Sequence, residues 1–148
     1  MLGRTYDDQV CSAARALEVV GERWTLLIVR DVLLGTVRFD GLLTSLGIAR
    51  NVLSDRLTRL VEHGVLERVA YQQHPLRYEY HPTPAGRELA VVVVALMQWG
   101  DRNVPSPEGP PRTALHATCG SELVACLVCP DCGSPARAGE VTMRSNRS

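Results

Sequence analysis

Apolar residues recur every three or four positions through residues 8–63, which is the spacing of amphipathic helices. The pattern predicts four helices, over residues 8–20, 23–34, 39–46 and 49–63. A glycine follows each helix, and glycine commonly ends a helix; the four are Gly21, Gly35, Gly47 and Gly64. The third helix is short, and Gly47 turns the chain sharply into the fourth. These features predict a helix-turn-helix.

The predicted helix over 49–63 has one apolar and one polar face. Leu53, Leu57 and Leu60 form the apolar stripe that would pack on the core. The polar side chains on the opposite face and at its margins are Asn51, Asp55, Thr58, Glu62, Arg50, Ser54 and Arg59. Such a face is either a solvated helix surface or a surface for a partner.

Two runs of β-type residues follow the fourth helix. They lie at 66–71 and 78–80 and are separated by the sequence QQHPLR, which predicts a hairpin with a loose tip. Two strands directly after a helix-turn-helix make a winged helix. Arg77 lies on this wing, where an arginine can enter the minor groove of DNA while the fourth helix lies in the major groove. We therefore expect a mainly α, α+β winged helix-turn-helix with a small β-hairpin wing.

A fifth helix is predicted from Pro84 to about residue 100, with Thr83 as its N-cap. It is apolar on nearly all sides, so it is either a fully buried core helix or a subunit interface. The residues expected at a dimer interface are Leu89, Val92, Val93, Leu96 and Trp99. A dimer would also present two reading helices one turn of DNA apart.

Proline and glycine divide the chain into a body and a tail. The segment VPSPEGPP at 104–111 cannot form a helix interior and suits a semi-rigid connector. We predict a winged-helix DNA-binding and dimerisation domain over 1–103, a proline-rich linker over 104–112, a cysteine-rich hairpin over 113–136 and a disordered tail over 137–148.

The composition narrows the class of protein. Of the 148 residues 45% are hydrophobic, and 16 basic residues balance 16 acidic ones. This is typical of a globular protein and argues against one that coats polyanions. Residues 38–77 are the basic region, with six arginines against four acids. The longest apolar run, 89–97, is too short to span a bilayer, and the first residues do not resemble a signal peptide. We therefore expect a cytoplasmic protein with no membrane partner and with reduced cysteines.

Several motifs follow one another along the body. They are Cys11, VGERWTLLI at 20–28, LLG at 33–35, Arg38-Phe39, VLSDRL at 52–57, EHGVL at 62–66, Pro75, Arg77 and Glu79-Tyr80 in the wing, TPAG at 83–86 and Trp99-Gly100. Over residues 11–102 the chain resembles the HxlR-type family of bacterial winged-helix transcriptional regulators. Ser12 and Pro82 depart from the family pattern, which often has a proline and an aliphatic residue at these positions.

The resemblance implies a DNA-binding transcriptional regulator of the bacterial cytoplasm that has no enzyme activity. Its partners would be a second copy of the chain and a double-stranded inverted-repeat operator, where members of the family usually repress, and sometimes activate, neighbouring genes; we expect a repressor. The residues implied nearest the base edges are Arg50, Asn51, Ser54 and Asp55. Arg56 and Arg59 are implied at phosphates, and Arg38 and Arg77 at the DNA backbone or minor groove. The sequence identifies no small-molecule effector and no cofactor for this domain.

Cys11 has two interpretations. In some members of the family the matching cysteine senses oxidants or electrophiles, and the N-terminus of the first helix would lower the pKa of the Cys11 thiol. The alternative is a small, buried packing residue. A redox- or electrophile-responsive regulator acting through Cys11 is therefore an alternative function.

The tail holds four of the five cysteines. His116 and Cys119, and likewise Cys129 and Cys132, are separated by two residues and followed by glycine, which is the pattern of a zinc knuckle. One interpretation is a structural zinc ion held by these four residues, with Cys126 as an alternative ligand. The two other interpretations are a reduced, metal-free hairpin and a hairpin closed by a disulfide. With zinc, the chain could instead be a zinc-dependent protein-interaction module on a winged-helix scaffold. A zinc deaminase is excluded because His116 does not begin the H-x-E motif it needs.

Overall fold

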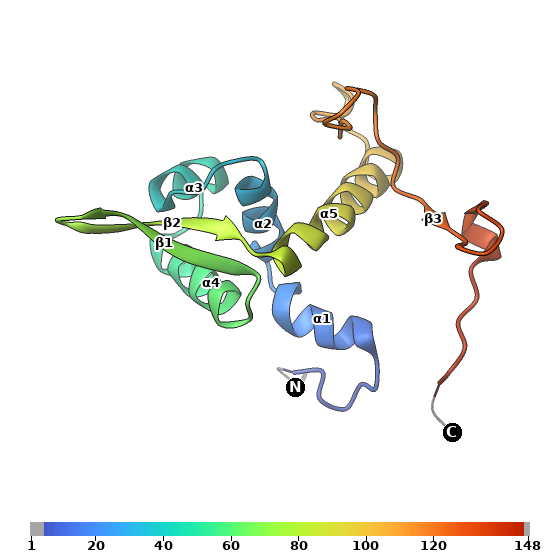
Figure 1. Cartoon of the computed structure of the whole chain (residues 1–148), viewed down its shortest axis with the longest axis horizontal. Helices are drawn as coiled ribbons and strands as arrows, with labels where there is room; N and C mark the ends of the chain where they lie inside the picture. The colour runs from blue at the N-terminus through green and yellow to red at the C-terminus, as the bar shows by residue number, and fades with distance from the viewer. Residues whose placement is uncertain (1–4, 147–148) are drawn as a thin grey trace. The chain divides into compact units, whose positions relative to one another are not determined.

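A computed structural model describes residues 5–146 of the chain (Figure 1). The elements in order are α1 (Ser12–Val20), α2 (Thr25–Leu33), α3 (Phe39–Leu46), α4 (Arg50–Glu62), β1 (Leu66–Gln73), β2 (Leu76–Pro82), α5 (Pro84–Asn103), β3 (Leu127–Val128), β4 (Pro135–Ala136) and the 3₁₀ helix η1 (Ala138–Glu140). Five α-helices with an antiparallel β1–β2 hairpin make the described part of the chain a winged helix-turn-helix, as predicted. None of its helices has the length and hydropathy needed to cross a bilayer.

Internal contacts divide the chain into two compact units, Met1–Val93 and Val94–Ser148. The division falls inside α5, whereas the sequence places a domain boundary after residue 103; the predicted domains stay a prediction. The predicted first domain and tail include residues 1–4 and 147–148, which lie outside the described residues. Within the tail predicted as disordered, the structure places the helix η1.

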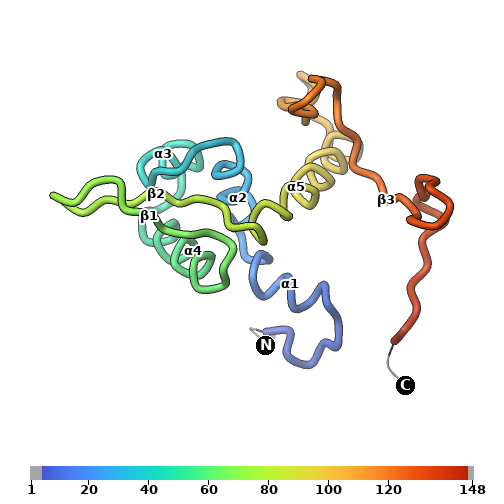
Figure 2. Tube along the Cα trace, in the orientation of Figure 1, coloured from blue at the N-terminus to red at the C-terminus, as the bar shows by residue number. Residues whose placement is uncertain are grey.

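The core of the first unit comes from the apolar stripes that the sequence predicts. Leu53, Leu57 and Leu60 of α4 are at most 1% exposed. The other buried residues of this cluster are Ile28, Val29 and Val32 of α2, Leu42 and Leu46 of α3, and Val65 and Leu66 at the start of the hairpin. Figure 2 shows the hairpin extending past α3 and α4, so its tip lies away from this core.

Three helices have an end that differs by two or more residues from the predicted one. α1 begins at Ser12 rather than at residue 8, because the preceding residues form a turn in which the Gln9 amide donates to the Tyr6 carbonyl. α2 begins at Thr25 rather than at residue 23, because Trp24 has a left-handed backbone (φ 80°). α5 continues past residue 100 to Asn103, whose side chain donates to the Trp99 carbonyl at 2.9 Å.

The hairpin is longer and more regular than predicted. Its strands extend into the segment expected to be a loose tip, so that Gln73 pairs with Leu76. Only two residues then remain in the turn, and this short connection keeps the strand ends close enough to pair. The register shifts between Ala70 and Gln72, which marks a bulge in β1. Pro82 ends β2, where a missing N–H donor interrupts no further pairing.

The first turn of α5 is fastened to the junction between α4 and β1. Thr83 is the N-cap, as predicted: its hydroxyl accepts from the Gly86 amide at 3.1 Å and donates to the Gly64 carbonyl. Gly86 is buried, and a Cβ at this position would lie 2.1 Å from the Val65 carbonyl oxygen. Close approach of α5 therefore depends on the absence of a side chain at Gly86.

The second unit contains the end of α5 and the cysteine-rich segment. The Gln98 side chain of α5 donates to the Leu123 carbonyl at 2.7 Å and accepts from the Ala125 amide at 2.8 Å. None of residues 113–146 is buried. This segment is therefore ordered by turns, short strand pairs and the Gln98 contact rather than by an apolar core.

Candidate nucleic-acid interface

The second helix of the helix-turn-helix presents a polar surface. The buried leucines fix the rotation of α4, and Gly47, with a left-handed backbone (φ 63°), makes the turn that leads into it. The side chains left on the opposite face are exposed and polar; they are Asn51, Ser54, Asp55 and Thr58. This is the face that the sequence predicts to be solvated or bound to a partner.

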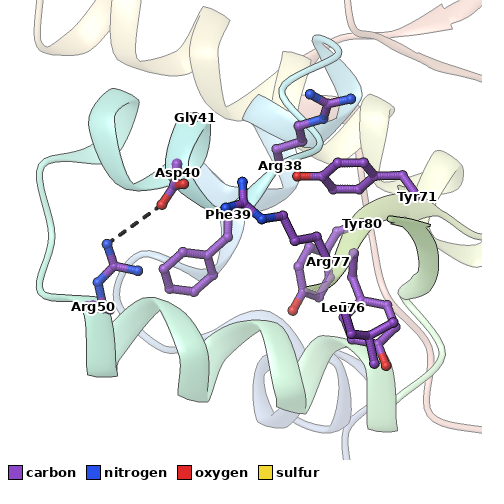
Figure 3. A pocket seen from close by; sticks show the side chains of 10 residues that line it. Arg38, Phe39, Asp40, Gly41, Arg50, Tyr71, Leu76, Arg77 and Tyr80 are labelled. Atoms are coloured by element: carbon purple, nitrogen blue, oxygen red, sulfur yellow. Dashed lines mark ion pairs between the residues drawn. The ribbon is translucent and has the colours of Figure 1, made fainter. Parts of the chain in front are cut away.

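A cavity of about 640 Å³ lies beside the start of α4 (Figure 3). Its walls come from the start of α3, from the first residue of α4 and from the hairpin. The lining residues are Arg38, Phe39, Asp40, Gly41, Arg50, Tyr71, Leu76, Arg77, Tyr78 and Tyr80. The structure thus brings together three predicted DNA contacts, Arg38, Arg50 and Arg77, among four aromatic rings.

Two of the three arginines have partners within the chain. Arg38 pairs with Glu79 at 3.1 Å and lies over the Tyr71 ring, 4.2 Å from its centre. Arg50 lies 3.6 Å from the Asp40 carboxylate and 5.2 Å from the centre of the Phe39 ring. The Arg50–Asp40 pair is exposed on both sides, so solvent weakens it and Arg50 can exchange its partner at small cost, whereas the Glu79 side chain of the Arg38 pair is only 22% exposed.

Arg77 differs from the other two arginines of the cavity. It is exposed, and its side chain makes no hydrogen bond, ion pair or ring contact with the rest of residues 5–146. It is therefore the cavity's arginine that carries its whole charge to solvent.

The hairpin is held to the start of α3, so it does not move independently of the helix-turn-helix. The Tyr80 amide donates to the Val37 carbonyl at 2.7 Å, and Arg38 and Glu79 form a bridge between the two segments. Hydrogen bonds from His81 and then from Arg38 hold the pKa of the Glu79 carboxyl below its usual range. Glu79 therefore stays ionised, and the ion pair helps to position the wing relative to α4.

The side chains of Arg56 and Arg59 form ion pairs within the chain, whereas side chains that contact phosphates would be expected to face solvent. Both pair with Glu22, each at 2.8 Å, and Arg56 also pairs with its neighbour Asp55 and donates to the Arg23 carbonyl. The Arg56 side chain is 21% exposed. These contacts join α4 to the segment between α1 and α2. DNA contacts by Arg56 and Arg59 stay a prediction, which would require them to leave Glu22.

Sequence reasoning missed the aromatic lining of the cavity. In the sequence pattern, Tyr71 and Tyr78 indicate strands, and Phe39 is one of the apolar residues of a helix. One available signal was the spacing of Tyr78 and Tyr80, because alternate residues of a strand share a face. The position of Tyr71 depends on the bulge in β1, which no local pattern predicts.

Cys11 is the N-cap of α1 and is exposed. The backbone amides of Ala14 and then of Ala13 hold the pKa of its thiol below the ordinary value, with a smaller contribution from Arg15. This is the effect expected at a helix N-terminus. In the single chain, Cys11 is therefore an accessible thiol rather than a buried packing residue.

The predicted interface residues of α5 fall into two groups. Val92, Leu96 and Trp99 are 46%, 52% and 54% exposed. Val93 is buried, and Leu89 packs against the core of the same chain. The predicted face is thus shifted, because α5 uses one side to cover its own unit. Val91, 70% exposed, also stands on the uncovered side.

The predicted metal ligands form two separate pairs. The His116 Nδ1 atom lies 3.2 Å from the Cys119 sulfur, and Cys129 and Cys132 occupy the corresponding positions of a second turn. Hydrogen bonds from Ser121, and then from His116, lower the pKa of Cys119 to about 7. Within residues 5–146, no three His, Cys, Asp or Glu side chains lie close enough to hold one metal ion. Zinc binding stays a prediction.

The sequence of residues 19–108 matches the family model described as HxlR-like helix-turn-helix, and this range contains the whole helix-turn-helix, the hairpin and α5. The chain belongs to this HxlR-like family. The HTH-type transcriptional regulator Rv3095 of Mycobacterium tuberculosis is 51% identical over 131 residues, covering 88% of this chain and 83% of Rv3095.

Solved structures show the same fold. The crystal structure of PA1607, titled a "Putative Transcription Factor", is 35% identical to this chain in sequence. It has a TM-score of 0.80, over 93% of this chain and 96% of its own. The oxidised redox regulator HypR is 29% identical with a TM-score of 0.58, over 63% of this chain and 97% of its own. This HxlR-like chain is accordingly a helix-turn-helix transcriptional regulator, a class of proteins that bind DNA.

Proposed function

We propose that the chain binds an inverted-repeat operator as a homodimer and represses transcription there. The observation that carries this proposal is the exposed polar face of α4 beside a cavity where Arg38, Arg50 and Arg77 converge. α4 enters the major groove, and the rigidly attached hairpin reaches the neighbouring minor groove. The proposal assigns the chain no enzymatic activity and places it in the bacterial cytoplasm.

The residues divide into those that read bases and those that hold the backbone. Asn51 and Ser54 lie on the exposed face near the start of α4, where a side chain meets base edges, and an asparagine can bind adenine with two hydrogen bonds. Arg38 and Arg77 hold phosphates on either side of the cavity. Arg50 exchanges the weak contact with Asp40 for a phosphate or a guanine edge.

The dimer is supported by the uncovered apolar face of α5. Val92, Leu96 and Trp99 are about half exposed on a helix that buries Gly86 and Val93 within its own chain. Contact with a second copy removes this surface from water and gives a two-fold axis. Two α4 helices related by such an axis read two half-sites in opposite orientation, which defines the inverted repeat.

A selection from random duplex DNA tests the proposal. The full chain is used at physiological salt with a reductant, and the enriched pool should contain an inverted repeat. Asn51→Ala should relax the base preference at one position of each half-site, whereas Arg87→Ala should leave the preference unchanged, since Arg87 is exposed on α5 and lies outside the cavity. An unenriched pool would contradict the proposal and favour a protein-interaction module on the same scaffold.

A second function is favoured by Cys11. This thiol is exposed, its pKa is lowered, and the similar protein HypR is a redox regulator. Modification of Cys11 would then change the affinity for the operator. The test compares operator binding before and after treatment with diamide. The response should disappear in Cys11→Ser and persist in Cys126→Ser; a response that survives in Cys11→Ser would refute this role.

A further inference from the structure

Two turns in the second unit share one sequence pattern. Residues 116–121 read HATCGS and residues 129–134 read CPDCGS, so each has a metal-ligating residue, two intervening residues, and then Cys-Gly-Ser. The repeat includes a serine after the glycine, which is not needed for the spacing of ligands. The two segments are therefore alike beyond the zinc-knuckle pattern itself.

The backbones of the two turns carry the same hydrogen bonds. In the first, the His116 amide donates to the Ser121 carbonyl at 2.8 Å and the Gly120 amide donates to the His116 carbonyl at 2.7 Å. The corresponding distances in the second are 3.0 Å from Cys129 to Ser134 and 2.9 Å from Gly133 to Cys129.

Both turns also depend on a left-handed glycine. Gly120 has φ 74° and Gly133 has φ 70°. Each turn closes a small antiparallel pair, Leu115 with Glu122 in the first and Val128 with Pro135 in the second. Sequence and hydrogen bonding thus build the same hairpin tip twice.

Each tip brings its two ligating side chains together. The His116 nitrogen and the Cys119 sulfur are 3.2 Å apart. Tetrahedral zinc, with bonds of about 2.0 Å to nitrogen and 2.3 Å to sulfur, separates two such ligands by roughly 3.5 Å. Cys129 and Cys132 occupy the two corresponding positions of the second turn, which has the same backbone hydrogen bonds. Each turn therefore has the form of half a tetrahedral site.

The connection between the turns is held at its middle. The Gln98 side chain donates to the Leu123 carbonyl and accepts from the Ala125 amide. Within residues 5–146 the two ligand pairs are not gathered around one point, so a shared zinc ion requires this connection to change its conformation.

The segment also needs a source of stability. No residue of 113–146 is buried, and several apolar side chains, such as Leu127 and Val128, are more than half exposed. A segment this small without a core is usually stabilised by a metal ion or a disulfide. Two preformed turns that each offer a ligand pair favour the metal ion.

We propose that these turns are the two halves of one structural Zn²⁺ site within the chain, with His116, Cys119, Cys129 and Cys132 as ligands. Three thiolates and one imidazole in a tetrahedral set suit zinc better than an oxygen-preferring cation. Cys126 lies in neither turn and is not a ligand. The site stabilises the cysteine-rich segment and is separate from the residues assigned to DNA.

Cobalt substitution tests the proposal on the full chain under reducing conditions. Cobalt(II) bound by cysteine thiolates gives charge-transfer and tetrahedral ligand-field absorption bands. The proposal expects about one cobalt per chain. Binding should be lost in both Cys119→Ser and Cys132→Ser, and Cys126→Ser should bind like the unchanged protein. His116→Cys should keep stoichiometric binding with a stronger charge-transfer band, because a fourth thiolate replaces imidazole.

Several results would overturn this site. They are no stoichiometric cobalt, two cobalt ions per chain, or binding that survives Cys119→Ser but not Cys126→Ser. A mixture of Cys119→Ser and Cys132→Ser chains should also fail to bind cobalt. If mixing restores binding, the ligands come from two different chains and the site within one chain is wrong.

Discussion

Replacing Arg77 by alanine gives the most direct test of how the cavity holds DNA. The Arg77 side chain has no hydrogen bond, ion pair or ring contact with the rest of the described chain, so its removal breaks no polar side-chain interaction. Stability should therefore be unchanged. Arg38→Ala is a poorer choice, since it would leave Glu79 without its ion pair and loosen the wing.

The size of the effect follows from counterion release. Each phosphate contact contributes about 0.9 to the slope of log K against log salt, so a dimer that loses two contacts should have a slope smaller by about 1.8. Over a fourfold range of salt concentration this difference amounts to roughly a twelvefold smaller loss of affinity. The largest deficit in binding appears at low salt.

Fluorescence anisotropy measures the slope on the selected operator and on an unrelated duplex of equal length. Arg77→Ala should reduce both slopes equally, because phosphates carry no sequence information. Arg87→Ala is the matched control and should leave both unchanged. A slope that is unaltered in Arg77→Ala would refute the phosphate contact, and a reduction confined to the operator would assign Arg77 to the bases instead.

Three further predictions concern stability, assembly and reactivity. Gly86→Ala should lower the free energy of unfolding by about 1–3 kcal/mol in a denaturant titration, because its Cβ would lie 2.1 Å from the Val65 carbonyl. Gly100→Ala in the same helix meets no atom within 4 Å and should be neutral or slightly stabilising. Leu96→Glu should yield monomers in sedimentation, whereas Leu96→Met should stay dimeric; a Leu96→Glu dimer would move the interface elsewhere. The rate of alkylation of Cys11 can be measured by mass spectrometry as a function of pH. Its midpoint should lie below the pKa of about 8.5 of a free thiol, since the amides of Ala14 and Ala13 favour the thiolate. A midpoint at or above that value contradicts the helix effect.

The parts of the fold that follow from local patterns were predictable. The leucines of α4 repeat with the helical period, so their burial, and hence the polar face opposite, follows from three residues. Thr83 and Pro84 likewise marked the start of α5. The sequence did not show which apolar residues of α5 are buried within the chain and which stay exposed. Val93 is buried and stands on the same side of the helix as Gly86, which lies against the Val65 carbonyl; only the tertiary structure reveals that contact.

The candidate site was predictable in its residue types but not in its pairings. Arg38, Arg50 and Arg77 meet as expected of a winged helix. Arg56 and Arg59, equally basic in sequence, turn to Glu22 instead. Glu22 lies in the connection between α1 and α2, where Trp24 has a left-handed backbone, and a non-glycine residue gives no sequence signal for such a conformation.

The contact between Gly86 and Val65 determines how a signal could reach DNA. Because α5 begins in direct backbone contact with the junction of α4 and β1, a tilt of α5 would act on α4 through this contact. In a dimer joined through α5, the crossing angle of the two α5 helices would set the separation of the two reading helices. An event that changes this angle would then change the distance between the two α4 helices. It would move the reading helices out of step with the operator while every residue that touches DNA stays the same.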